Sequence, residues 1–256
     1  MEYTELLERQ IIGRLKVDNP WWLEGAVPDY FAKMSPRLYL NIFMPLLQSV
    51  ELRRALILMG PRRVGKTVMM FHAIQRLIDS GVPAQNIVYI SVETPIYNKI
   101  YLEQLYRLAC GILGKDPVND RMFVFYDEIQ YLNKKQQQSL LEYIESGKIT
   151  LIASTTENPY FYIYSAVLSR CTVFEFKSVT PEDIVPNIKR GFCFLEEETG
   201  IPLEIEDGVC EHIATACGGD VRKSLNFVEL CVLSASIVDG KRMITLENTG
   251  SLTMKN

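Results

Sequence analysis

The sequence predicts an α/β fold in which a five-stranded parallel sheet carries helices on both faces and is followed by a small all-helical domain. Two observations carry this prediction. Short apolar runs alternate with longer amphipathic segments from Ala55 to Phe176, a pattern typical of a parallel sheet. After Phe176 the apolar runs stop, and amphipathic segments with helical periodicity follow.

The predicted strands contain apolar runs such as LILM, IVYI, FVFY and TLIA, which strands covered on both faces require. They are Ala55–Met59, Ile87–Val92, Arg121–Tyr126, Ile149–Thr155 and Thr172–Phe176. The amphipathic segments between them are predicted to be helices, at Lys66–Asp79, Ile100–Ile112, Lys135–Ser146 and Phe161–Leu168. Further helices are expected at Pro181–Glu198, Glu204–Cys217 and Val221–Val238. Thr180, Pro181 and Asp183 together form a helix-starting pattern.

These elements predict the organisation of the chain. Residues 1–50 form a helical or irregular lead-in that contains Trp21–Trp22 and several prolines. Residues 51–178 form the α/β domain, residues 179–246 the helical domain, and residues 247–256 a tail.

Composition excludes several classes of protein. The 256 residues are 48% hydrophobic and 23% charged, which is ordinary for a globular protein and excludes a disordered chain or a collagen-like fibre. The longest apolar runs are far shorter than the roughly 20 residues that a membrane span needs, and the acidic start is no secretory signal. We therefore expect a cytoplasmic protein without a membrane partner. The cysteines form no CxxC pair and are interpreted as mostly buried free thiols.

Charge is distributed unevenly along the chain, whose formal net charge is −4. Residues 1–176 hold 19 basic and 18 acidic residues, whereas residues 177–256 hold 8 basic and 13 acidic residues. Such a chain has no overall electrostatic attraction for nucleic acid. Contact with DNA would therefore be local, assembled in an oligomer, or absent.

The segment GPRRVGKT, residues 60–67, matches the pattern GxxxxGK[ST] in full. It lies between a predicted strand and a predicted helix, which is the context that a phosphate-binding P-loop requires, although a chance match in a turn is the alternative. Such a loop surrounds phosphate with backbone N–H groups at a helix N-terminus. We expect Lys66 to reach the β- and γ-phosphates of ATP and Thr67 to hold Mg²⁺. The residues expected to contact the nucleotide are Gly60, Pro61, Arg62, Arg63, Val64, Gly65, Lys66, Thr67 and Val68.

An acidic pair, Asp127 and Glu128, follows the predicted strand that begins at Arg121. Alone, such a pair usually marks a solvated strand end, but here it follows the P-loop with one strand and one helix between them. Asp127 is expected to bind the water shell of Mg²⁺. Glu128 is expected to take a proton from the attacking water.

Three further positions are ambiguous from the residues alone. Thr155 belongs to a polar strand end, Thr155–Asn158, that would equally serve to cap the next turn. Arg170 precedes the last strand, and Arg222 opens the last predicted helix. Each arginine taken by itself indicates a surface ion pair rather than a catalytic group.

The order of these motifs resembles an AAA+ ATPase. Residues Met122–Glu247 resemble the RarA/MgsA family of replication-associated recombination ATPases through the strings DEIQYLNKKQQQSLLEYIESGKITLIASTTENPYF, AVLSRCTVFEFKSVTPEDI and GGDVRKSLNFVEL. Residues 1 to about 110 instead resemble the ATPases of the DUF4143-associated group, through RLYLNIFMPLL and RRALILMGPRRVGKTVMM. The chain thus resembles a mosaic of two P-loop families joined between about Cys110 and Arg121.

The resemblance implies roles for the ambiguous residues. Thr155 takes the sensor-1 position, which orients the lytic water. Arg170 matches the arginine finger, which acts on the ATP of a neighbouring subunit, and Arg222 matches sensor 2 in the lid, which touches the γ-phosphate. The resemblance therefore implies self-association through Arg170.

The resemblance also implies a cellular role. It implies Mg²⁺-dependent ATP hydrolysis in the replication, repair and recombination of DNA at stalled forks, with single-stranded or forked DNA and replication proteins as partners. RarA-type proteins continue into a C-terminal helical domain used for tetramer formation, whereas this chain ends at Asn256, so we expect weak oligomerisation and weak turnover. Two alternatives stay open: a nucleotide-binding module with little or no hydrolysis, and a P-loop ATPase of unknown partner without a DNA role.

Overall fold

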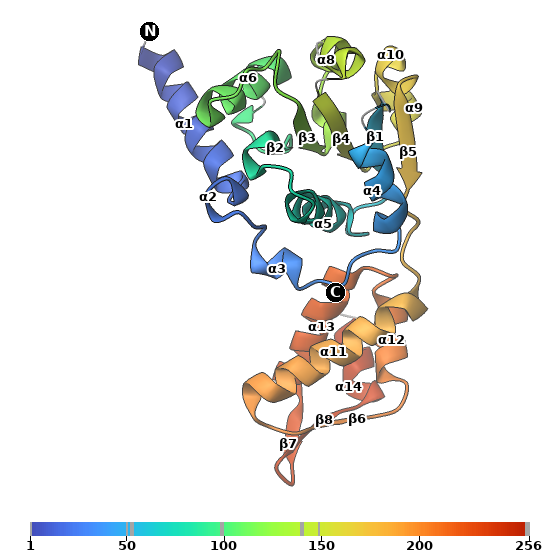
Figure 1. Cartoon of the computed structure of the whole chain (residues 1–256). Coiled ribbons are helices and arrows are strands. Elements are labelled where there is room, and N and C mark those ends of the chain that lie inside the picture. The colour runs from blue at the N-terminus through green and yellow to red at the C-terminus, as the bar shows by residue number, and fades with distance from the viewer. Residues whose placement is uncertain are drawn as a thin grey trace. The chain divides into compact units, whose positions relative to one another are not determined.

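The predicted strands form one parallel sheet in the computed structural model of the chain (Figure 1). They are β1 (Ala55–Met59), β2 (Ile87–Ser91), β3 (Met122–Asp127), β4 (Ile149–Thr155) and β5 (Cys171–Glu175). Their order is β2-β3-β4-β1-β5, and every neighbouring pair is parallel. β3 and β4 are buried along their whole length, as expected for strands covered on both faces, whereas β5 is only partly buried and ends in the exposed Glu175.

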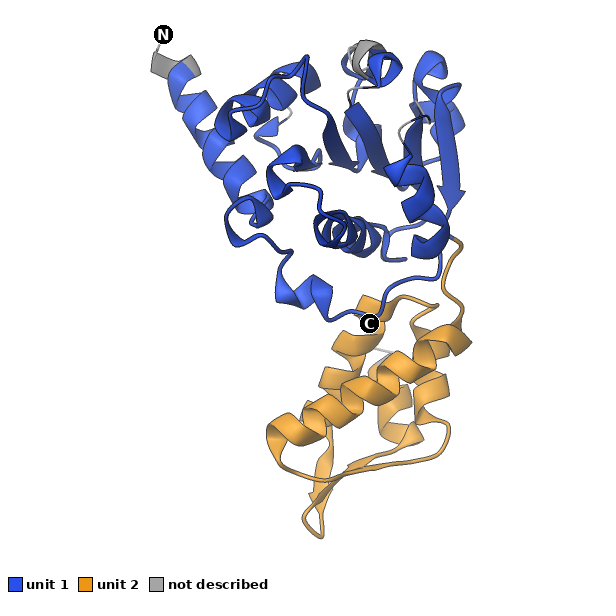
Figure 2. Cartoon of the chain, viewed as in Figure 1, with its two compact units in different colours: residues 1–176 blue, residues 177–256 orange. Residues whose placement is uncertain are grey.

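The structure describes residues 2–49, 51, 54–97, 100–138, 141–147 and 149–253. It separates into unit 1, residues 1–176, and unit 2, residues 177–256 (Figure 2). Within the described ranges, no helix combines the length and the apolar character that crossing a membrane would need.

Helices cover both faces of the sheet in unit 1. They are α5 (Lys66–Asp79), α6 (Leu102–Leu113), α7 (Lys134–Gln138), α8 (Leu141–Ser146), α9 (Pro159–Tyr162) and α10 (Ser165–Leu168). The chain passes from β1 to the edge strand β2 through α5 and then returns across the sheet to β3, β4 and β5. Because parallel crossovers are right-handed, this reversal places α5 on one face and the later helices on the other (Figure 1).

Two of the predicted helices differ in detail. The helix predicted over Phe161–Leu168 is two short helices, α9 and α10, because Ile163 leaves the helical conformation and buries its side chain. The helix predicted over Lys135–Ser146 is described as α7 and α8, and Ser139 and Leu140 between them lie outside the described residues.

The lead-in covers the outer edge of β2. It forms α1 (Glu2–Asp18), α2 (Trp21–Glu24), α3 (Asp29–Ala32) and α4 (Leu40–Gln48). An edge strand leaves backbone groups without strand partners. Here the indole N–H groups of Trp21 and Trp22 both donate to the carbonyl oxygen of Ile87, at 3.1 and 2.7 Å. The side chain of Asn19 pairs with both the N–H and the carbonyl of Tyr89. These side chains take the place of a sixth strand.

The lead-in also packs on α5. The ring of Phe71 on α5 stacks on Phe31 with centroids 4.0 Å apart, and it meets Trp21 edge to face at 5.8 Å. Stacked and edge-to-face rings add to the energy of burial. This packing holds the helix whose first residue is Lys66.

The core of unit 2 is built on α11 (Pro181–Thr199), α12 (Val209–Ala216) and α13 (Val221–Ser234). Their buried side chains form one core that includes Ile184, Ile188, Phe192, Ile213, Phe227 and Val228. Thr180 caps α11 as predicted: its hydroxyl accepts the Asp183 N–H at 3.4 Å, and the Asp183 carboxylate accepts the Thr180 N–H at 3.3 Å.

The prediction that this unit is all-helical is wrong. β6 (Leu203–Ile205), β7 (Ser236–Val238) and β8 (Lys241–Ile244) form a small sheet, and α14 (Leu246–Thr253) lies where a tail was expected. Glu204 and Val238 therefore lie in strands rather than helices. β7 and β8 are antiparallel and are joined by Asp239 and Gly240, whose φ angles are 49° and 78°. An Asp-Gly pair between two strands is a signal of this hairpin turn.

We expect Gly219→Ala to destabilise unit 2 strongly. Gly219 has a φ of 81°, and a Cβ added there would overlap the carbonyl oxygen of Val179 and lie 3.1 Å from its carbonyl carbon. Because alanine adds both left-handed strain and a backbone clash, the free energy of unfolding should fall by about 3 kcal/mol or more. Urea unfolding measures this change.

Gly218→Ala is the matched control. Gly218 has a φ of 59°, but no heavy atom lies within 4 Å of an added Cβ. Alanine there should cost only the strain of a left-handed residue, about 1–2 kcal/mol. Equal destabilisation by the two substitutions would contradict the role given to the Val179 contact.

Candidate functional site

The loop between β1 and α5 consists of the residues predicted to bind phosphate. A Cβ added at Gly60 would overlap the carbonyl oxygen of Phe176 and lie 2.7 Å from the Phe176 Cβ, so the chain needs glycine there. Gly65 has a φ of 91° and forms the N-cap of α5. The loop therefore brings its backbone to the N-terminus of a 14-residue helix, a position that favours anions.

Lys66 lies inside this loop and is only 5% exposed. Its ammonium donates to the carbonyl oxygens of Gly60 and Pro61, at 2.8 and 2.9 Å. Burial lowers the pKa of Lys66, and the negative charges of Glu128 and Asp127 oppose this shift. A buried cation is stabilised best by a charged partner. An anion in the loop would supply that partner.

Asp127 is the centre of the site, at the end of β3. The Thr67 hydroxyl donates to Asp127 Oδ2 at 2.8 Å, and the Tyr89 phenol from β2 donates to the same oxygen at 2.9 Å. The Ser154 hydroxyl from β4 donates to Asp127 Oδ1. Burial and then the Asp127 charge raise the pKa of Tyr89, so its phenol stays a donor. Hydroxyls from α5, β2 and β4 thus fix one carboxylate.

Glu128 turns out of the strand with a φ of 61° and a ψ of 51°. Its backbone N–H donates to Ser154 Oγ at 3.0 Å. The Gln130 amide donates both to the Glu128 carboxylate and to Thr156 Oγ1. A non-glycine residue in this conformation is strained and persists where its surroundings hold it. These contacts hold the Glu128 carboxylate beside the end of β4.

Thr155 is the last residue of β4 and lies at the carboxyl ends of the strands, as Asp127 does. It pairs with Met59 in the register of β1 and β4, and its carbonyl accepts the Gly60 N–H at 3.2 Å. Its hydroxyl accepts the Glu157 N–H at 3.1 Å. The backbone of Thr155 therefore contacts the loop, whereas its hydroxyl bonds to its own turn.

Arginines surround the loop. Arg62 donates to the Tyr131 hydroxyl at 3.0 Å, and Arg63 has a φ of 68°. Arg37 of the lead-in donates to the carbonyl oxygen of Val64 at 2.9 Å. The P-loop thus receives a positive charge from a segment outside its motif, which sequence analysis did not anticipate.

Arg170 lies at the amino ends of the strands, opposite the carboxyl ends where the loop and Asp127 lie. The register pairs Ala55 with Cys171 and Met59 with Glu175, so Arg170 precedes the amino end of β5 whereas the loop follows the carboxyl end of β1. The five residues of β5 span about 16 Å. Arg170 Nε forms a half-exposed ion pair with Glu145 at 2.7 Å. It therefore does not join Lys66 and Asp127 of its own chain.

Arg222 belongs to unit 2. It is exposed in the first turn of α13, after Asp220, whose side chain caps that helix by accepting the Lys223 N–H at 3.0 Å.

Comparison with known proteins identifies the fold. Residues 52–165 match a family model described as an AAA domain. Unit 1 has the AAA fold. A solved structure of a RuvB mutant from Thermotoga maritima shares this fold with a TM-score of 0.57. The matched region covers 85% of this chain and 66% of the RuvB chain, at 22% sequence identity.

Sequence relatives agree with the AAA resemblance. Replication-associated recombination protein A of Bacillus subtilis (strain 168) is 34% identical over 205 residues, which are 78% of this chain and 45% of that protein. The protein of the same name from Escherichia coli (strain K12) is 38% identical over 132 residues, which are 50% of this chain and 29% of that protein. The chain spans less than half the length of these relatives. The resemblance to the RarA/MgsA family is confirmed.

The similarity continues through the predicted join between Cys110 and Arg121. The AAA family match runs from residue 52 to residue 165 and crosses it. A match over 78% of the chain, as with the Bacillus subtilis protein, must also include these central residues.

The AAA fold brings Lys66, Thr67, Asp127 and Glu128 together with the predicted loop residues Gly60 and Pro61. It adds three residues that sequence analysis missed, namely Tyr89, Ser154 and Gln130. Ser154 directly precedes the polar strand end, so its position was a usable signal. Tyr89 offered none, because a tyrosine in a buried strand usually belongs to the core.

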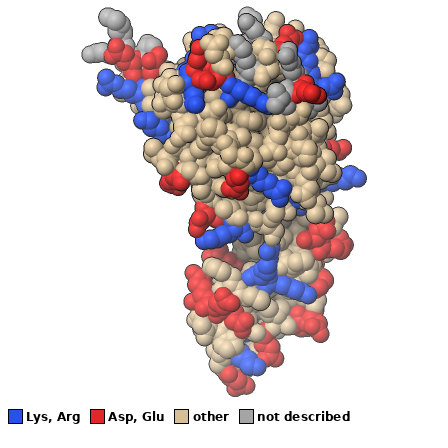
Figure 3. Space-filling model, viewed as in Figure 1, with Lys and Arg blue, Asp and Glu red and all other residues tan. Residues whose placement is uncertain are grey.

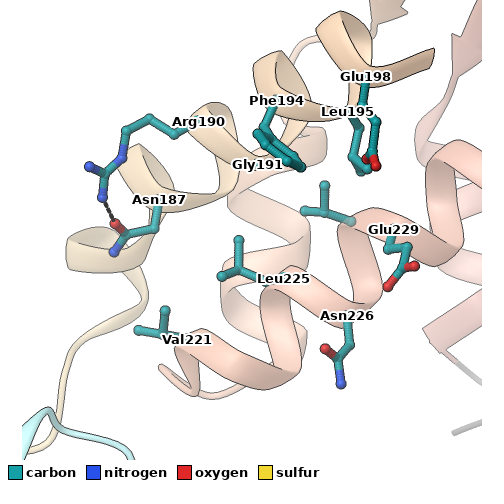
Figure 4. Close-up of a pocket in the computed structure, with 11 residues that line it drawn as sticks. Asn187, Arg190, Gly191, Phe194, Leu195, Glu198, Val221, Leu225, Asn226 and Glu229 are labelled. Atoms are coloured by element: carbon teal, nitrogen blue, oxygen red, sulfur yellow. Dashed lines mark hydrogen bonds between the residues drawn. The ribbon is translucent and has the colours of Figure 1, made fainter. Parts of the chain in front are cut away.

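Unit 2 carries a separate groove between α11 and α13 (Figure 4). Phe194 and Leu225 line it, and Gly191 lets the helices approach, since a Cβ added there would lie 3.0 Å from Leu225 Cδ2. Most of the lining is apolar, and Arg190 and Glu198 stand among it. The groove gathers no set of reactive side chains comparable to the one around Asp127.

Proposed function

We propose that this chain binds ATP with Mg²⁺ and hydrolyses it to ADP and phosphate. The observation that supports this most directly is the 2.8 Å hydrogen bond between Thr67 Oγ1 and Asp127 Oδ2. It joins the hydroxyl of the loop motif to a carboxylate 60 residues away. Hydroxyl and carboxylate oxygens are the donors that Mg²⁺ prefers, so this pair fits the ion.

Each loop residue has a role in binding. The backbone N–H groups from Gly60 to Val68 would surround the phosphates, and Lys66 would replace its carbonyl partners with the β- and γ-phosphate oxygens. Thr67 would hold the Mg²⁺ directly, and Asp127 would hold its water shell. The ion held by these two residues would supply positive charge against the charge that develops on the phosphates.

Hydrolysis further needs an activated water. Glu128 would accept the proton of that water, and Gln130 supports this role because its amide orients the Glu128 carboxylate. Thr155 is proposed as the sensor-1 residue. Gln130 also bonds to the neighbouring Thr156, so the sensing element would include the whole end of β4.

Arg170 and Arg222, which lie outside the loop and the carboxyl ends of β1 and β3, would act on the γ-phosphate. Arg170 would act on the ATP of a second copy of the chain. This role is supported by its position at the amino end of β5, away from the loop of its own chain. Arg222 would act from unit 2. A guanidinium beside the transferring phosphoryl group stabilises its charge in the transition state.

A DNA-linked role is supported by the replication-associated relatives, and we place it in the cytoplasm as part of the proposal. In this role the chain would act with DNA and replication proteins. Acidic side chains are spread over unit 2 in the view of Figure 3, in line with the 13 acidic and 8 basic residues of that unit. Because phosphate contacts need basic residues, the charge balance favours DNA contact on unit 1, which has 19 basic and 18 acidic residues.

Glu128→Gln is expected to bind ATP with unchanged affinity and to hydrolyse it about 10²–10⁴-fold more slowly, because it loses a base but no phosphate contact. Equilibrium binding and steady-state turnover measure the two effects. Lys66→Ala is the comparison and should lose affinity, because it removes a charge from the phosphates. Wild-type affinity in Lys66→Ala would overturn the assignment of the loop as the phosphate site. Wild-type turnover in Glu128→Gln would overturn the assignment of Glu128 as the general base.

Arg170→Ala is expected to lower turnover by about 10³-fold or more if the guanidinium acts as a finger. As a surface ion pair alone, the substitution would change stability by at most about 1 kcal/mol and leave turnover unchanged. Because a finger acts on the neighbouring copy, mixing inactive Arg170→Ala with inactive Lys66→Ala should restore part of the activity. Failure to recover on mixing, with turnover independent of protein concentration, would exclude the finger.

Forked or single-stranded DNA is expected to raise ATP turnover if the DNA-linked role holds. The rate is measured with and without DNA at two salt concentrations, since phosphate contacts weaken as salt rises. Turnover that DNA leaves unchanged at both salt concentrations would favour an ATPase with another partner.

A further inference from the structure

Tyr89 gives the site a hydroxyl that the P-loop motif does not contain. It lies on β2 and is 7% exposed, and its phenol donates to Asp127 Oδ2 at 2.9 Å. This is the oxygen that also accepts the Thr67 hydroxyl, at 2.8 Å. β2 and β3 pair so that Ser91 faces Asp127 in the register, which puts Tyr89 one pleat earlier on the neighbouring strand. The phenol therefore reaches the carboxylate on the face of the sheet where the Tyr89 ring packs against Phe71 of α5.

The backbone of Tyr89 is itself fixed by the lead-in. Asn19 is fully buried, donates to the Tyr89 carbonyl at 2.9 Å and accepts the Tyr89 N–H at 2.6 Å. The same side-chain amide donates to the Leu15 carbonyl on α1 at 2.8 Å. These bonds hold the edge strand at the very residue whose phenol reaches Asp127. The position of the phenol is thus set by tertiary contacts rather than by a free rotamer.

We propose that Tyr89 is a positioning residue for the Mg²⁺ that accompanies the nucleotide; this inference rests on the proposed function. A carboxylate held by Thr67, Tyr89 and Ser154 has one orientation, with Thr67 Oγ1 beside it. Without the phenol, Oδ2 keeps one donor and the carboxylate gains freedom to rotate away from the Thr67 hydroxyl. Side chains that orient metal-binding groups typically contribute about 10–100-fold to metal affinity.

The experiment is a Mg²⁺ titration of nucleotide binding to the full chain. The probe is ADP labelled with a fluorophore on its ribose, because ADP cannot be hydrolysed during the measurement. Wild type, Tyr89→Phe and Tyr97→Phe are compared, first in EDTA and then with increasing Mg²⁺. Tyr97 is the matched control: it is 2% exposed, and its phenol donates to Asp18 Oδ2 at 2.8 Å, away from the P-loop.

Tyr89→Phe is expected to raise the half-saturating Mg²⁺ concentration about tenfold and to leave the affinity in EDTA unchanged. Tyr97→Phe should match wild type in both measurements. Thermal unfolding of both variants controls for folding, since each loses one buried phenol hydrogen bond.

A wild-type Mg²⁺ titration in Tyr89→Phe, or tighter Mg²⁺ binding, would overturn the inference. An equal shift in both variants would also overturn it, because that result indicates a general packing effect. Failure of the proposed function shows separately, as a wild-type protein that binds no labelled ADP.

Discussion

The site depends on one buried carboxylate, Asp127, at the carboxyl end of β3. A carboxylate with 5% exposure is costly unless donors surround it. Its donors come from the first turn of α5, from β2 and from β4, so a shift of any one of these elements would take a donor away from the carboxylate. One of these bonds also holds the Thr67 hydroxyl at the carboxyl end of β3. Under the proposed function, the hydrogen bonds that satisfy the carboxylate would also prepare the Mg²⁺ site.

The lead-in belongs to this arrangement. β2 ends the sheet, and the edge of a parallel sheet needs partners for its backbone groups. Trp21 and Trp22 provide them at Ile87, and Asn19 provides them at Tyr89. Arg37, further along the lead-in, donates to the P-loop carbonyl of Val64. Residues 2–49 thus support the site from two directions, through β2 and through the loop.

The parallel sheet also separates the chemistry into two groups. The loop, Asp127 and Glu128 gather at the carboxyl ends of β1 and β3, where helix N-termini and strand ends meet. Arg170 is excluded from this group because it enters β5 at the amino end. Under the proposed function, one chain would bind the nucleotide, and a second copy would bring the remaining charge. In that case the geometry of parallel strands would give a physical reason for turnover to depend on assembly.

The sequence by itself determined the strands of the main sheet, the loop that ends in Lys66 and Thr67, the acidic strand end, and the Thr180 cap. Each of these depends on local periodicity or on a short motif, which neighbouring residues specify. Only the tertiary structure decided the hydroxyl partners of Asp127, the closing of the β2 edge, the small sheet of unit 2 and the edge at which Arg170 lies. Thr67, Tyr89 and Ser154 are far apart along the chain and meet because the strand order is β2-β3-β4 and α5 follows the loop. Local patterns predict strands, but the order of strands, and therefore which side chains meet, depends on packing across the whole sheet.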